Sequence, residues 1–149
     1  IILMIITGIS IAWGLFAIPS TLNPQREAYD YLEDLGLDPE PIYRHANTLP
    51  VKIVFIAGLL LAIILMLFYL RNHQKLKNSQ QPDLHPYLIF VGWQLFDMLF
   101  SLVYDPMNAN QLSFSGILSL LISYLFYCGI PLIILYNLWM IKKEAATFQ

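Results

Sequence analysis

The sequence predicts an all-α fold, a polytopic membrane protein built as a four-helix transmembrane bundle. Apolar residues make up 58% of the 149-residue chain and charged residues only 12%, whereas a soluble domain carries about 25% charged residues. The apolar residues gather in four blocks of about 20 residues, the length that a helix needs to cross the hydrocarbon layer. Because backbone polar groups in lipid must bond within their own segment, we expect four helices in a single transmembrane domain.

The four predicted spans cover residues 1–19, 51–70, 87–104 and 116–141. The third is short for a span, and the fourth is long enough that we expect it to tilt. Pro131 falls inside the fourth span, where its missing backbone N–H predicts a kink. The chain begins with Ile1 inside an apolar run and without a methionine, so we expect further residues to precede it.

Lysine and arginine are distributed unevenly between the connecting segments. Residues 71–86 carry Arg71, Lys75 and Lys77, and the tail carries Lys142 and Lys143. Residues 20–50 carry two basic and six acidic residues, a net charge of 2 − 6 = −4. Because basic residues near the ends of spans remain in the cytoplasm, we expect the loop of residues 71–86 and both termini to be cytoplasmic. The loop of residues 20–50 is then the outer loop.

The outer loop carries the signals of a short amphipathic helix over residues 24–35. Asn23 and Pro24 suit its first turn, Gly36 suits its C-terminal end, and apolar residues recur on one face between them. We expect this helix to lie on the outer membrane interface. The alternative is an acidic surface that docks a partner.

Asp97 is the strongest candidate for a functional residue, because it lies near the middle of the third predicted span. An ionisable group at that depth costs about 2.5 kcal/mol or more. Gln94, Asp97, Ser101 and Tyr104 follow one another at helical spacing and form one polar stripe. We expect this stripe to face protein or water rather than lipid.

Three interpretations of Asp97 remain open. In the first, Asp97 is a structural residue that hydrogen-bonds a neighbouring helix, with Ser123, Tyr124 and Tyr127 of the fourth span as the expected partners. In the second, it pairs with a cation on another polypeptide, since no Lys, Arg or His lies deep in any predicted span. In the third, it takes part in moving protons or ions.

Small residues recur four positions apart in three of the spans, and such pairs let helix backbones approach closely in membranes. The pairs are Gly8 with Ala12, Ser10 with Gly14, Gly58 with Ala62, and Ser119 with Ser123. We expect these residues to mark helix-packing contacts.

Residues typical of catalytic and metal sites are scattered along the chain. His45, His73 and His85 lie in loops or at the ends of spans, and Cys128 is the only cysteine. This distribution predicts no metal site, no haem and no catalytic constellation, and we expect no cofactor. A net charge of −2 without a basic cluster argues against a nucleic-acid partner.

Three short stretches, LRNHQKLK, HPYLIFV and KKEAATF, lie at the ends or starts of the last three spans. With them, the chain from about residue 49 onward resembles a family of uncharacterised four-helix bacterial inner-membrane proteins whose tail ends in Thr-Phe. The loop of residues 71–86 is longer than in that family, and residues 144–146 make the tail less basic. The resemblance implies a place in the bacterial inner membrane and transfers no active site.

The function that we expect first is a non-catalytic integral-membrane subunit. Such a subunit assembles within the lipid bilayer with other membrane chains, or as a homo-oligomer, through its transmembrane helices. The alternative is a small proton- or solute-coupled transporter component that uses the Asp97 stripe. A third hypothesis is a membrane enzyme that processes lipids or quinones.

Overall fold

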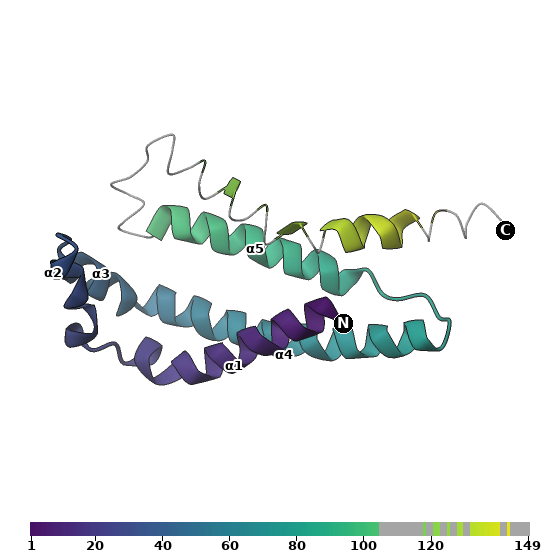
Figure 1. Ribbon diagram of the computed structural model, residues 1–149, viewed down its shortest axis with the longest axis horizontal. Helices are drawn as coiled ribbons and strands as arrows, with labels where there is room; N and C mark the ends of the chain where they lie inside the picture. Colours follow the sequence, from purple (N-terminus) through teal and green to yellow (C-terminus); the bar gives the residue numbers. More distant parts are fainter. Residues whose placement is uncertain are drawn as a thin grey trace.

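A computed structural model of the chain describes residues 1–104, 118, 121, 122, 125, 128, 129, 132–140 and 143. Within these residues the fold is all-helical and contains no strand, which confirms the predicted class for this part of the chain. Three helices among them are long and apolar enough to cross a membrane: α1 (Ile2–Leu22), α4 (Leu49–Lys77) and α5 (His85–Tyr104). Helix α4 contacts α1 and α5, so it is the central member of the three (Figure 1).

Helix α4 extends well beyond the apolar block that predicted it. It has 29 residues and continues through the polar stretch of residues 71–77, which the sequence analysis assigned to a loop. Most of these seven residues are good helix formers, and Lys75 and Lys77 suit the negative end of the helix dipole. The helix ends at Asn78, and Ser79 follows with a φ of 56°, so the chain turns sharply toward α5.

The segment between α1 and α4 folds into a small helical cap, made of η1 (Arg26–Tyr29), α2 (Tyr31–Asp34) and α3 (Pro39–Ala46). The single helix expected over residues 24–35 is thus divided into a 3₁₀ turn and one short α-helical turn. Gly36 ends α2 with a φ of 72°. Helix α3 was not expected; it begins where the Asp38 carboxylate accepts a hydrogen bond from the backbone N–H of Glu40, at 3.0 Å.

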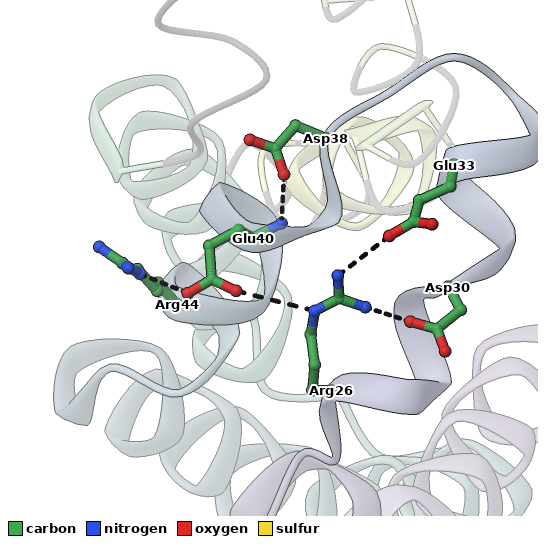
Figure 2. Close-up of polar contacts among 6 residues, drawn as sticks. All are labelled: Arg26, Asp30, Glu33, Asp38, Glu40 and Arg44. Atoms are coloured by element: carbon green, nitrogen blue, oxygen red, sulfur yellow. Dashed lines mark hydrogen bonds and ion pairs between the residues drawn. The ribbon is translucent and has the colours of Figure 1, made fainter.

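Arg26 is the centre of the polar contacts in the cap, as Figure 2 shows. Its guanidinium pairs with Asp30, lies 3.0 Å from an oxygen of Glu33 and 3.7 Å from an oxygen of Glu40. Glu40 also accepts a 2.6 Å hydrogen bond from Arg44. The bond to Glu33 and the surrounding carboxylates raise the pKa of Arg26. Three of the six acidic residues of the cap are therefore engaged by one cation within it.

The core lies at the opposite end of the helices from the cap, near the turn that joins α4 to α5. Its buried members are Leu3, Leu65, Tyr69 and Tyr87, which come from α1, α4 and α5. Residues 132–140 are helical, and Ile134, Leu135 and Leu138 pack against this core. A complete fourth spanning helix stays a prediction. The expected positions Ser119, Ser123, Tyr124, Tyr127 and Pro131 lie outside the described residues.

Candidate functional site

The three long helices line an open groove of about 720 Å³, here called the three-helix groove. Its walls come from α1 between Ile6 and Gly14, from α4 between Val54 and Leu65, and from α5 between Phe90 and Asp97. The α4 wall covers eleven residue steps, or about 16 Å at 1.5 Å per residue. The groove therefore occupies the middle of the helices rather than either end.

The groove brings together two residues of the predicted polar stripe. Gln94 and Asp97 are both half-buried on the α5 wall, and Asp97 lies about 4.5 Å farther along the helix axis. The other two members of the stripe do not line the groove: Tyr104 is half exposed, and its ring stacks on Phe100 with 4.7 Å between ring centroids. Only the half of the stripe nearer the core thus faces the cavity.

The α1 wall of the groove adds two hydroxyl groups. Thr7 is only 5% exposed, although it is polar. Ser10 donates a hydrogen bond from its hydroxyl to the backbone carbonyl of Ile6, at 2.9 Å, so its donor is used within its own helix. By contrast, the Gln94 amide makes no hydrogen bond within the part of the chain that the structure describes.

Four of the predicted packing residues line the groove, namely Ser10, Gly14, Gly58 and Ala62. A methyl group added at Gly58 would lie 3.1 Å from Cζ2 of Trp93, so the indole of α5 packs directly against the α4 backbone there. A methyl group at Gly14 would lie 2.8 Å from a methyl carbon of Leu59. These two glycines serve contacts inside the chain. Gly8 and Ala12 do not line the groove.

Beyond the core, α4 is joined to the turn that precedes α5 by a polar contact that the sequence did not predict. Asn72 is 1% exposed, and its amide donates to the Asp83 carbonyl at 2.8 Å and accepts from the Asp83 N–H at 2.9 Å. The Lys75 ammonium binds both carboxylate oxygens of Asp83, at 2.8 and 2.9 Å. These hydrogen bonds hold the pKa of the Asp83 carboxyl below its ordinary value. We call this contact the Asn72–Asp83 clamp.

The core adjoins the end of the groove that points toward the clamp. Leu65 belongs both to the groove wall and to the core, where it is 3% exposed. Directly beyond it, the rings of Tyr69 and Tyr87 stack with centroids 5.4 Å apart. The groove thus has a hydrophobic floor.

The arrangement suits binding rather than covalent chemistry. Its walls are largely apolar and include the aromatic rings of Trp13, Phe55, Phe90 and Trp93. Its hydrogen-bonding side chains are an amide, a carboxyl and two hydroxyls. Within the described residues, no group of three His, Cys, Asp or Glu residues is placed to hold a metal ion. An apolar cavity with a few polar groups is typical of a small-molecule site.

The comparisons with known proteins leave the resemblance of residues 49–149 a prediction. No family model, no curated protein and no solved structure matches this chain.

Proposed function

We propose that this chain is a non-catalytic integral membrane protein that takes a bilayer-dissolved molecule into the three-helix groove, as the binding component of a transport assembly. One observation carries the proposal: Gln94 and Asp97 lie together on the wall of a largely apolar groove between three helices long enough to span a membrane. Polar groups at such depth are costly in lipid and are retained where they serve a site or a path.

The distribution of charge supports an orientation for this protein. Lys75 and the neighbouring Arg71 and Lys77 gather at the clamp, whereas the cap is acidic. With the basic end in the cytoplasm, the cap lies outside and the groove lies near the middle of the membrane. A hydrophobic molecule would then reach the groove from the hydrocarbon layer, without crossing either aqueous surface.

Native mass spectrometry of the chain, extracted together with its surrounding lipids, tests the proposal. We expect one bound molecule of lipid-like mass for each wild-type chain. Ala62→Phe places a large side chain into the groove and should abolish this occupancy. The matched control is Ile64→Phe, because Ile64 lies on the same helix, is 49% exposed and does not line the groove. Equal occupancy in the two variants would contradict the proposal.

A second candidate is the membrane subunit expected from the sequence, with a transmembrane helix of another chain seated in the groove. The small residues Ser10 and Ala62 on the groove wall favour it, because they leave room for a helix at close approach. In the same experiment this function predicts a co-purifying chain that Ala62→Phe displaces and Ile64→Phe retains. The absence of a second chain from the wild-type complex would argue against it.

A further inference from the structure

We infer that the molecule bound in the three-helix groove is an uncharged, single-tailed amphiphile with an oxygen-bearing head, such as a long-chain alcohol or a quinone, and that the Gln94 amide binds this head. The inference rests on the proposed function and adds the chemical class of the ligand to it.

The first step concerns the hydrogen bonds of Gln94. A primary amide has two N–H donors and a carbonyl acceptor. The Gln94 side chain is half-buried on the groove wall and has no hydrogen-bond partner among the residues that the structure describes. In hydrocarbon, an amide without a partner costs several kcal/mol. A hydroxyl or carbonyl oxygen in the groove would hydrogen-bond the amide and so remove this cost. A purely hydrocarbon occupant would not.

The second step concerns charge. Gln94 lies nine residues after His85, near the middle of the 20-residue helix α5. An ionic or zwitterionic head brought to that depth loses its hydration. The free energy of this loss is far larger than the free energy gained from hydrogen bonds to the Gln94 amide. A small neutral head avoids this penalty.

The third step concerns the shape of the groove. A volume of about 720 Å³ is within the range of roughly 300–1,000 Å³ for sites that hold one small molecule, so one tail fits better than two. Aromatic rings on all three walls, among them Trp13, Phe55 and Trp93, offer flat apolar faces to a ring or an unsaturated tail. The α4 wall runs from Val54 to Leu65, where it meets the core, so a tail has room to lie along the groove.

The experiment uses Trp93 of the groove wall as the reporter. Trp93 lines the groove and is half-buried, whereas Trp13 is 73% exposed and Trp139 does not line the groove, so a chain carrying Trp13→Phe and Trp139→Phe reports mainly on the groove. The purified protein in detergent is titrated separately with four quenching probes: a brominated long-chain alcohol, a short-tailed quinone, a brominated long-chain amine and a brominated phosphatidylcholine. We expect saturable quenching by the alcohol, the quinone or both, at lower concentration than by the amine or the phospholipid. The alcohol and quinone arms show which head is preferred.

Two variants of Gln94 test whether the amide binds the head. Gln94→Met keeps the length of the side chain but removes the amide. It should lower the affinity for the preferred probe by about tenfold or more, as expected for the loss of one buried hydrogen bond. Gln94→Asn keeps an amide and should restore part of this affinity. The control is Asn137→Leu, since Asn137 carries an amide that bonds the Ile133 carbonyl and does not line the groove.

The contrary outcomes separate the two proposals. Stronger quenching by the amine or the phospholipid, or a Gln94→Met variant with unchanged affinity, would overturn the inference and leave the proposed function standing. If none of the probes quenches in a saturable manner, and the parent chain and Ala62→Phe behave alike, the proposed function itself is overturned.

Discussion

At the scale of single residues, Asn72 is the most deeply buried polar side chain that the structure describes. Both ends of its amide bond the backbone of Asp83, so removing it leaves the partly buried N–H and carbonyl of Asp83 without these partners. We expect Asn72→Ala to lower the free energy of unfolding by about 1–3 kcal/mol. Thermal unfolding in detergent, followed by circular dichroism, measures the change.

The control for this prediction is Asn78→Ala, which removes an exposed asparagine six residues farther along the chain. It should leave the unfolding midpoint almost unchanged. Equal midpoints for the two variants would show that the clamp contributes nothing to stability.

Asp83 makes the same region sensitive to acid. The Lys75 hydrogen bonds lower the pKa of Asp83 below its ordinary 3.8, so the ionised form favours the folded state. The resulting stabilisation is present above about pH 3.8, the pKa in the unfolded chain, and is lost as the pH falls through the lower pKa of the folded chain. We expect Asp83→Asn to unfold at a lower temperature than the wild type at pH 7, and the difference between the two midpoints to shrink as the pH falls below 3.8. A difference that does not shrink on acidification would contradict this assignment.

Only those residues of the candidate site that differ in polarity from the segment around them could be predicted from the sequence. Gln94 and Asp97 interrupt an apolar block, and this contrast is visible in the sequence. Asn72 lies in a polar stretch and Asp83 in a loop, so neither attracts notice. Their importance comes from a contact across eleven residues of chain, and hydropathy carries no information about such contacts.

At the scale of elements, hydropathy located the three long helices but not where they end. The apolar block of α4 stops near residue 70, whereas its hydrogen bonding continues to Lys77, because helix propensity and charge placement decide the end. Helix α3 did have a local signal, because Asp38 followed by Pro39 and Glu40 is typical of a helix start. The similar pair Asn23-Pro24, from which a helix was expected, begins none: Asn23 is the C-cap of α1, and η1 begins at Arg26.

The contact between α4 and α5 gives a prediction at this scale. Gly92 lies on α5 with no described atom within 4 Å of an added methyl group, whereas a methyl at Gly58 lies 3.1 Å from the Trp93 ring. Gly92→Ala should therefore stabilise the protein by up to about 1 kcal/mol through helix propensity. Gly58→Ala gains the same propensity but must displace the indole, so it should be the less stable of the two.

Thermal midpoints and tryptophan emission compare these variants. We expect a changed emission maximum for Gly58→Ala and an unchanged one for Gly92→Ala. A Gly58→Ala protein at least as stable as Gly92→Ala would mean that Trp93 moves aside without cost, and that the glycine is not needed for the approach of the helices.

At the scale of the whole molecule, the groove exists only because α1 and α5 both lie against α4. The sequence predicted that the polar stripe faces protein or water, yet it could not say that Ser10, Gly58 and Gln94 would share one cavity. Each residue's place on its own helix follows from helical periodicity. The pairing and rotation of the helices depend on packing between segments far apart in the chain.

The proposed orientation gives a prediction for the whole molecule. In a chain carrying Cys128→Ser, a single cysteine is introduced either in the cap by Asp34→Cys or in the turn by Asn78→Cys; both positions are exposed. A membrane-impermeant maleimide added to intact bacterial cells should label the cap variant. It should label the turn variant only after the inner membrane is permeabilised. The reverse pattern would invert the orientation.

Helices α1 and α5 are attached to α4 in different ways, so we expect the walls of the groove to differ in stiffness. Helix α1 is tied to α4 through the cap at one end and through Leu3 in the core at the other. The described contacts of α5 with α4 run from the stacked rings of Tyr69 and Tyr87 to the Gly58–Trp93 contact. We therefore expect an occupant of greater width to be accommodated by a tilt of α5. Because Gln94 and Asp97 belong to that one helix, their spacing stays constant, while their distance from Thr7 and Ser10 adjusts to the size of the occupant.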